Sequence, residues 1–251
     1  HSLTGYAEGY EAQNDTERRA IYLAMLETID ELFGELIVEV DQQTLPTTVV
    51  YLSDNGSKDN ARDPFFLGQP GKGTPYQGGV HIPLLVAGHG VPASSEGATS
   101  DVVVSINDVF PTLAEVHGIA SPLLPAEATS FAYALTTPAA PTQRAIACSH
   151  WFKTAGFVVL GARLGEASHQ CQDSQYKVLQ YGVGATPELY DLSADPLETT
   201  DLNDGSLSAA EQAAYDALLP GVDPAATAAC ANGLDDDGDG AIDLALSLIH
   251  I

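Results

Sequence analysis

Apolar residues recur at helical spacing between residues 17 and 40 and define the first regular element of the chain. They are Ile21, Met25, Ile29, Leu32, Phe33, Leu36, Ile37 and Val40. Residues three and four apart share one face of a helix, so this spacing predicts a helix of about six turns. The helix is expected to begin at Asp15 or Thr16, either of which can act as its N-cap.

An unbroken apolar and β-branched run, residues 47–52 (TTVVYL), follows Pro46. Such a run is typical of a buried strand in a parallel sheet, and the run at 82–87 predicts another strand. A helix followed by a parallel strand, repeated along the chain, predicts a doubly wound and mainly parallel α/β sheet. Residues 102–104 (VVV) add a short predicted strand.

The pattern changes in the second half of the chain. Val109 to His117 forms a predicted helix, which Ser105 or Asp108 caps, and a short helix is expected near 129–135. Further on, short apolar runs predict a small antiparallel sheet, at 145–149, 157–160, 176–181 and 188–192. A final helix is predicted at 209–219, introduced by Ser206 or Ser208.

Polar residues follow the strand at 47–52 at once. Gly56 in the sequence Ser-Asp-Asn-Gly allows the chain to turn and leaves Asp54 and Asn55 at the carboxyl end of the strand, where ligands bind in open α/β sheets. Carboxylate and amide oxygens suit Ca²⁺ or Mg²⁺, although the same residues also form good turns. A glycine-flanked loop, residues 71–74 (GKGT), then brings in Lys72.

In this order the segments resemble the sulfatase family of the alkaline phosphatase superfamily. The family pattern is S/T-D-N-G after a strand, then G-K-G, then E-G-G-x-R-x-P before a second strand. Residues 107–113 (NDVFPTL) and 188–198 (ELYDLSADPLE) resemble two later family signatures. Two positions depart from the pattern, because Gln77 replaces the usual Glu and His81 the usual Arg. An ion pair that braces the lysine loop in the family would be altered here.

The resemblance implies a sulfuric ester hydrolase that acts on a sulfate-ester small molecule or a sulfated glycan. Asp54 and Asn55 would be two ligands of Ca²⁺, with Mg²⁺ as an alternative, and Lys72 would bind the sulfate. His1, in a segment that loosely matches the H-x-P-L type, is a candidate substrate-binding histidine.

The nucleophile implied by the resemblance is a formylglycine made from a C/S-x-P-x-R motif, which none of the three cysteines matches. We therefore expect the nucleophile upstream of this sequence. Residues 1–143 are then the C-terminal part of a catalytic α/β domain, residues 144–220 a small antiparallel subdomain, and the 251-residue chain alone is expected to be inactive.

Two alternatives remain open. The first is a phosphatase, phosphodiesterase or phosphoethanolamine transferase of the same superfamily. Those two-metal enzymes tend to carry Asp-His at the strand end, whereas Asn55 favours a single hard cation. The second is a non-catalytic extracellular scaffold that resembles sulfatases and binds calcium.

Charge excludes some partners. The chain has 34 Asp and Glu but only 9 Lys and Arg, and its formal net charge of −25 repels nucleic acid and anionic membranes. No apolar stretch approaches the ~20 residues that a membrane span needs.

The C-terminal composition predicts a separate acidic module at 225–245. Its carboxylates alternate as in the first half of a calcium loop, at Asp235, Asp237, Asp239 and Asp243. Leu246 stands where the loop needs a bidentate Glu, so we expect weak calcium binding or none, and a solvated acidic linker is the alternative. Residues 246–251 (LSLIHI) resemble a sequencing-derived tail and are excluded from the fold.

The acidic calcium tail and the odd number of cysteines indicate export, either secreted or periplasmic. Cys148 and Cys171 could bridge neighbouring strands, and Cys230 would then lack a partner in this sequence. Free buried cysteines are the alternative.

Overall fold

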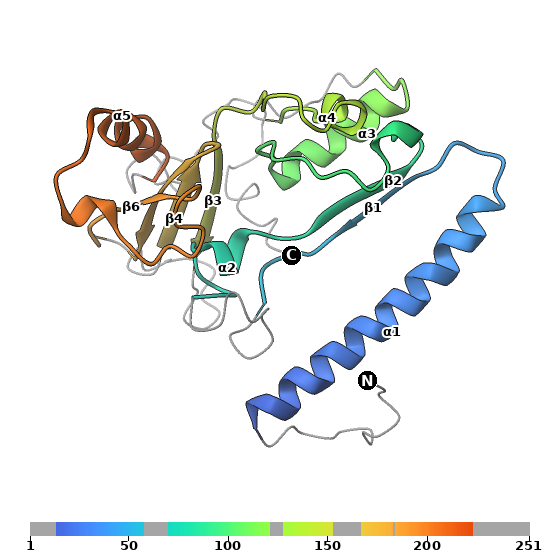
Figure 1. The fold of residues 1–251 in the computed structure, drawn as a ribbon, viewed down its shortest axis with the longest axis horizontal. Helices are drawn as coiled ribbons and strands as arrows, with labels where there is room; N and C mark the ends of the chain where they lie inside the picture. The colour runs from blue at the N-terminus through green and yellow to red at the C-terminus, as the bar shows by residue number, and fades with distance from the viewer. Residues whose placement is uncertain (1–13, 58–69, 121–127, 153–166, 183, 223–251) are drawn as a thin grey trace, which may run out of the picture.

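The structure is a computed structural model that describes residues 14–57, 70–120, 128–152, 167–182 and 184–222 (Figure 1). Its helices are α1 Asp15–Asp41, α2 Gln77–Val80, α3 Val109–Val116, α4 Ala132–Thr136 and α5 Ala209–Leu218. Its strands are β1 Thr48–Leu52, β2 Leu84–Gly88, β3 Ala147–Phe152, β4 Ala167–Gln172, β5 Tyr176–Tyr181 and β6 Glu188–Asp191. The predicted tail at 225–251, the strand at 157–160 and His1 lie outside the described residues.

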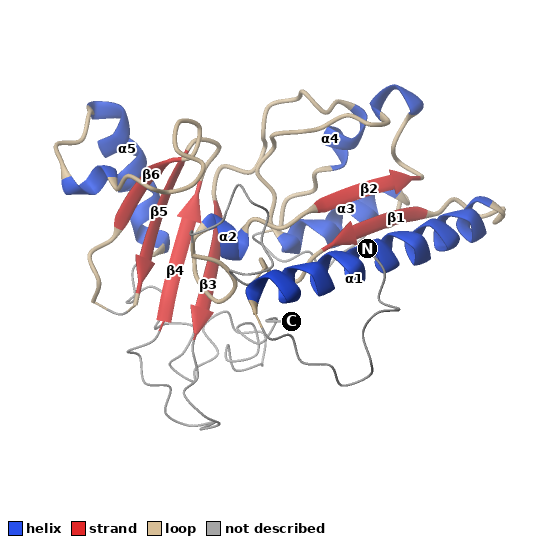
Figure 2. Cartoon of the chain, turned by 60° about the horizontal axis from the view of Figure 1, so that its bottom comes forward, coloured by secondary structure: helices blue, strands red, loops and turns tan. Residues whose placement is uncertain are grey.

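The described part of the molecule contains two sheets. Figure 2 shows the four-stranded sheet at one end and the β1–β2 pair at the other, with the short helix α2 between them. The α/β class and the small antiparallel second sheet are confirmed. The domain boundary at residue 143 stays a prediction.

The helix α1 is confirmed but has 27 residues, more than the predicted six turns, and its N-cap lies one residue before the earlier of the two expected caps. Asn14 is the N-cap, and its side-chain oxygen accepts a hydrogen bond of 3.0 Å from the Glu17 amide. Only Ala24 is buried along the helix. Phe33 contacts Tyr51 of β1 edge to face, with ring centroids 5.5 Å apart.

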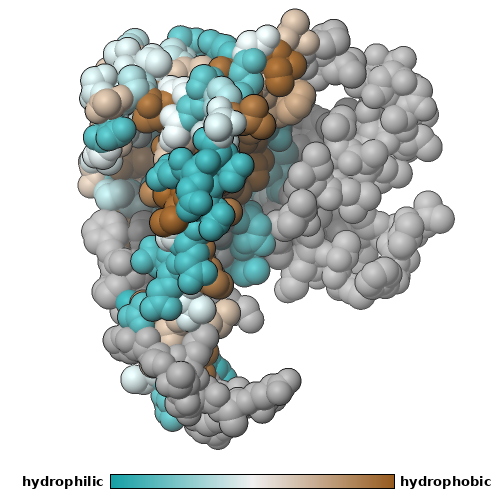
Figure 3. Space-filling model, turned by 90° about the vertical axis from the view of Figure 1, so that its right-hand side faces the viewer, coloured by the Kyte–Doolittle hydropathy of each residue, from teal (hydrophilic) through white to brown (hydrophobic). Residues whose placement is uncertain are grey.

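Apolar side chains of α1 remain exposed beside the β1–β2 pair, among them Met25, Ile29, Leu32 and Leu36. Figure 3 shows hydrophobic and hydrophilic atoms interleaved over the described part of this side of the molecule. A mainly apolar groove of about 600 Å³ separates the helix from the strands.

The pairing of β1 with β2 corrects one expectation. The two strands are antiparallel, with Thr48 opposite Gly88 and Leu52 opposite Leu84, whereas a mainly parallel sheet was predicted. After leaving β1, the chain returns to the same end of that strand, where the Gly56 amide donates to the Gly79 carbonyl at 2.8 Å. The chain therefore enters β2 from the end at which it left β1, and no crossover connection is needed.

The predicted strand at 102–104 is also wrong. These residues carry no strand pairing, because the Val103 amide donates instead to Thr142 Oγ1 at 3.1 Å. A neighbouring contact, from Ser100 Oγ to the Pro138 carbonyl at 2.7 Å, holds the same segment against the loop before β3.

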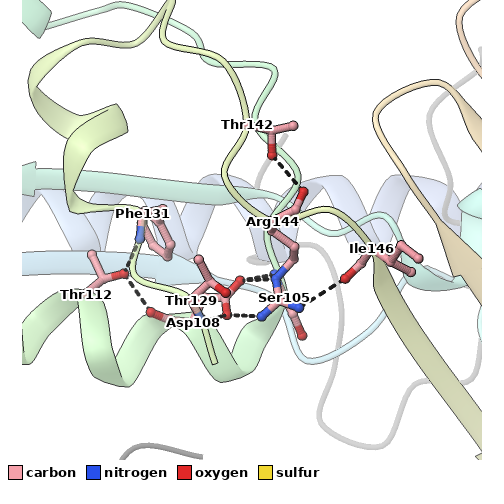
Figure 4. A network of polar contacts seen from close by, with 8 residues as sticks. All are labelled: Ser105, Asp108, Thr112, Thr129, Phe131, Thr142, Arg144 and Ile146. Atoms are coloured by element: carbon pink, nitrogen blue, oxygen red, sulfur yellow. Dashed lines mark hydrogen bonds and ion pairs between the residues drawn. The ribbon is translucent and has the colours of Figure 1, made fainter. Parts of the chain in front are cut away.

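A buried carboxylate organises the segment around α3, as Figure 4 shows. Ser105 and Asp108 form a capping box, and Asp108 is 1% exposed. Its oxygens also accept from the Thr129 amide at 2.7 Å and from Arg144 Nε at 2.7 Å. The segment 107–113, which resembles a family signature, thus contains a residue, Asp108, that joins three chain segments.

The four strands β3–β4–β5–β6 are antiparallel throughout. Cys148 and Cys171 lie opposite each other on β3 and β4 and form a disulfide. The helix α5 covers the sheet through a buried cluster of Cys171, Val178, Leu189, Leu218 and Val222. Ser208, one of the two predicted caps, forms a capping box with Glu211. The strand β4 was not predicted.

Candidate functional site

Asp54 and Asn55 lie directly beyond the end of β1, as the sequence predicts. Asp54 Oδ1 accepts from the Asn55 amide at 2.9 Å and from Asn55 Nδ2 at 2.7 Å. Within the described part of the chain, no hydrogen bond reaches Asp54 Oδ2 or Asn55 Oδ1. Both are hard oxygen atoms, which is the donor chemistry that Ca²⁺ and Mg²⁺ prefer.

The lysine loop returns to this strand end. The Lys72 amide donates to the Ser57 carbonyl at 3.0 Å, so the Lys72 backbone lies beside the turn that carries Asp54 and Asn55. Tyr22 of α1 adds a contact to the same turn, with 3.1 Å between its hydroxyl and Ser57 Oγ. The Lys72 side chain is exposed.

Glycines make this close approach possible. A Cβ atom on Gly56 would lie 2.0 Å from the Gly78 carbonyl oxygen, and one on Gly79 would lie 2.2 Å from that of Thr74. Both distances are well below van der Waals contact, so neither site tolerates a side chain without movement of the backbone. The glycines of the two family motifs thus hold the two segments against each other.

The lysine loop is also bound to the four-stranded sheet. The Gln77 amide donates to Glu198 Oε2 at 2.6 Å, and Glu198 Oε1 forms an ion pair with Lys177 Nζ at 2.6 Å. Gln77 Nε2 donates to Gln172 Oε1 at 3.2 Å, whereas His81 is exposed. The loop is therefore braced here by a carboxylate from another segment, and the two departures from the family pattern do not leave it without support.

A second carboxylate, Glu188, holds the same loop. The Tyr76 hydroxyl donates to both of its oxygens, at 2.8 and 3.1 Å, and the Tyr190 hydroxyl donates at 2.6 Å. Burial, and then the hydrogen bond to Glu188, raise the pKa of Tyr76 and that of Tyr190 above the ordinary value. Both hydroxyls therefore keep their protons and remain donors at neutral pH.

Glu188, Glu198 and Lys177 were not among the residues that the sequence singled out. The two glutamates begin and end the segment 188–198, which resembles a family signature. A lysine flanked by apolar residues in a strand, as Lys177 is, was the one signal that a buried partner must exist, because an unpaired buried ammonium is costly.

The described residues contain no group of three or more His, Cys, Asp or Glu that could hold a metal ion. Asp54 and Asn55 would supply two of the ligands only. Three of the histidines have other partners: His117 Nε2 is 3.0 Å from Thr48 Oγ1, and Nδ1 of His150 is 2.8 Å from that of His169. His1 and the aspartates at 235–243 lie outside the described chain.

Comparison with known proteins confirms the family resemblance. Residues 1–119 match the sulfatase family model. Arylsulfatase K of Mus musculus is 29% identical over 209 residues, which are 80% of this chain and 35% of that protein. Arylsulfatase K of Xenopus laevis is 30% identical over 195 residues, or 73% and 33%. The chain spans about a third of the length of these relatives.

Solved structures share the fold. A protein called BT4656, solved with its substrate D-glucosamine-2-N,6-O-disulfate, matches 88% of this chain over 41% of its own, with a TM-score of 0.62 and 20% identity. A phosphonate monoester hydrolase from Silicibacter pomeroyi matches 70% over 35%, with a TM-score of 0.54 and 21% identity. In the described residues, no helix is long and apolar enough to cross a bilayer.

Proposed function

We propose that this chain forms part of a sulfuric ester hydrolase and supplies half of a sulfate-binding site. The observation that carries the proposal is the return of the lysine loop to the end of β1, where the Lys72 amide contacts Ser57. It joins the two sequence motifs that resemble those of sulfatases, in a chain whose first 119 residues match that family.

Asp54 Oδ2 and Asn55 Oδ1 are the atoms that would hold Ca²⁺ or Mg²⁺ in this site. When bound, the cation supplies positive charge to the sulfate oxygens. The Lys72 ammonium binds a further sulfate oxygen and stabilises negative charge that develops there during ester cleavage. This local positive charge opposes the repulsion of an anionic substrate by a chain of net charge −25.

The nucleophile is expected from a segment outside this sequence, in the form of a formylglycine. Sulfated sugars are the first substrates to test, because the substrate of BT4656 is a sulfated glucosamine. The disulfide between Cys148 and Cys171 favours an oxidising compartment, either extracellular or periplasmic.

The test uses a polypeptide that joins this chain to a segment with a C/S-x-P-x-R motif, assayed on an aryl sulfate with and without a chelator. We expect chelation to abolish turnover, and Asp54→Ala and Lys72→Ala each to lower kcat/KM by about 100-fold or more. Asp101→Ala and Arg18→Ala remove the same charges at exposed positions and should leave the rate within about twofold. Equal losses in the site and control variants would refute the site.

Phosphoryl or phosphonyl transfer is the second candidate, because a phosphonate monoester hydrolase shares the fold. An aryl phosphonate is therefore assayed beside the aryl sulfate, with Zn²⁺ and with Ca²⁺. Faster turnover of the phosphonate with Zn²⁺ would favour this candidate over the sulfatase. Turnover by the 251-residue chain alone would refute an external nucleophile.

A further inference from the structure

The residues that join Glu198 to the segment after the lysine loop are more deeply buried than the anchoring of a surface loop requires. The side chains of Glu198 and Lys177 are 2% and 0% exposed, and Gln77 is 7% exposed. A buried charge is retained where it is both paired and hydrogen-bonded, and Glu198 has both kinds of partner. One of these partners is the backbone amide of Gln77, which lies three residues beyond the loop that carries Lys72.

The backbone of Glu198 is also unusual. Its φ is 54°, the left-handed region, and no other non-glycine residue in the described chain has positive φ. Side chains rarely occupy this region, because Cβ approaches the following carbonyl. Glu198 stands at the end of a turn in which its amide donates to the Asp195 carbonyl. The left-handed conformation at this position directs the Glu198 side chain toward the Gln77 amide.

Movement at Gln77 would be transmitted to Lys72 through rigid backbone contacts. Gln77 begins α2, whose Gly79 packs against the carbonyl oxygens of Gly71 and Thr74. Those two residues flank Lys72 and are themselves joined, since the Thr74 amide donates to the Gly71 carbonyl at 3.1 Å. A Cβ atom on Gly79 would lie 2.7 Å from the Gly71 oxygen and 2.2 Å from the Thr74 oxygen, which shows how closely these backbones approach.

We propose that Glu198 is a positioning residue for Lys72: its carboxylate fixes the Gln77 amide and thereby the loop that presents the lysine at the end of β1. Lys177 is the buried counter-ion of this carboxylate. The four-stranded sheet thus takes part in sulfate binding without contacting the substrate. The assignment of Lys72 rests on the proposed function, whereas the loop anchoring does not.

The first test separates the hydrogen bond from the buried charge. The double variants Glu198→Gln, Lys177→Met and Glu198→Leu, Lys177→Met both remove the ion pair, but only glutamine keeps an acceptor for the Gln77 amide. Amide exchange is followed at Lys72 and Gly56, whose own acceptors, Ser57 and Gly79, are unchanged. We expect exchange at both amides to be about tenfold faster in the leucine variant than in the glutamine variant. Equal rates would overturn the proposal.

A second pair of variants tests the donor and leaves Glu198 and Lys177 in place. Gln77→Pro and Gln77→Ala both lose the side-chain amide, but only proline loses the backbone N–H. Proline is tolerated at the first position of a helix, and Tyr76 before it already has φ −70° and ψ 162°. Faster exchange at Lys72 in the proline variant alone supports the proposal, and matching rates in both variants contradict it.

The catalytic readout uses the longer polypeptide described above. In the leucine variant kcat/KM should fall by about tenfold with KM raised, and the glutamine variant should restore it to within about twofold of wild type. If Glu198 only stabilised the fold, both variants would have a lower melting temperature, and KM would not differ between them. If wild type has no sulfatase activity, the proposed function fails, while the amide exchange still decides whether Glu198 holds the loop.

Discussion

Asp108 shows how much a single buried side chain can hold together. Besides capping its own helix, it pairs with Arg144, and the hydroxyl of Thr112 both donates to the Asp108 carbonyl at 2.6 Å and accepts from the Phe131 amide at 2.9 Å (Figure 4). The Arg144 and Asp108 side chains are 12% and 1% exposed. Removal of one partner from such a pair leaves the other charge in a poorly solvated place.

We therefore expect Asp108→Asn to lower the free energy of unfolding by about 3 kcal/mol, because the Arg144 guanidinium loses its carboxylate. Urea unfolding followed by circular dichroism measures the change. Asp101→Asn removes the same charge at an exposed position and should change the free energy by less than about 0.5 kcal/mol. Similar effects of the two substitutions would contradict a structural role for the buried pair.

The imidazole of His169 gives the second sheet a dependence on pH. Burial, and then the neighbouring His150, lower the pKa of His169 from 6.5 to about 4. A lowered pKa means that the neutral ring contributes stability that is complete above pH 6.5 and is lost as the pH falls through about 4. The contribution is at most about 3 kcal/mol.

This predicts that His169→Gln flattens the plot of unfolding free energy against pH between about pH 6.5 and 4. Chemical unfolding at several pH values measures the slopes. His81→Gln, at an exposed position, should keep the slope of wild type. A His169→Gln slope identical to that of wild type would show that this histidine does not couple to folding.

At the scale of elements, the sequence predicted what local patterns determine. The helix α1, the strands β1, β5 and β6, and the helix α5 follow from apolar spacing and capping residues. The antiparallel direction of β2 could not be read in this way, because contacts between Gly56 and Gly79 decide it. The strand β4 (ASHQCQ) has too few apolar residues to be recognised, although Cys171 on it is fully buried.

The same division holds for the candidate site. Asp54, Asn55 and Lys72 were found because each lies within a short motif. Glu198 is separated from Gln77 by 121 positions along the chain, so its role depends on a contact that no local pattern contains. Sequence alone therefore identified the groups proposed to touch the substrate and missed the group that holds one of them in place.

Helix capping provides an element-scale prediction with a control from the sequence itself. Ser208 Oγ accepts from the Glu211 amide at 3.3 Å, and Glu211 Oε2 accepts from the Ser208 amide at 2.6 Å. Ser208→Ala should lower the free energy of unfolding by about 1 kcal/mol. Ser206→Ala, at the alternative cap that the structure does not use, should change it by less than about 0.5 kcal/mol in the same urea titration. A larger cost at Ser206 would contradict the observed cap.

At the scale of the whole molecule, negative charge dominates. The chain has 34 acidic residues against 9 basic ones, and the mutual repulsion of this excess of carboxylates opposes the compact state. Salt weakens this repulsion, because the Debye length falls from about 10 Å at 0.1 M to about 3 Å at 1 M. Pairs that are buried, such as Glu198 with Lys177, are screened much less.

We expect NaCl between about 0.02 and 0.5 M to raise the melting temperature by a few degrees, since surface repulsion is screened while the buried pairs persist.

CaCl₂ at equal ionic strength separates screening from binding, because only binding to the folded state adds a further increase. If that increase disappears in Asp54→Asn, calcium acts at the end of β1, and if it disappears in Asp235→Asn with Asp237→Asn, it acts in the acidic tail. A melting temperature that falls with NaCl would contradict charge repulsion as a limit on stability, and identical values in the two salts would show that neither set of carboxylates binds calcium in this chain.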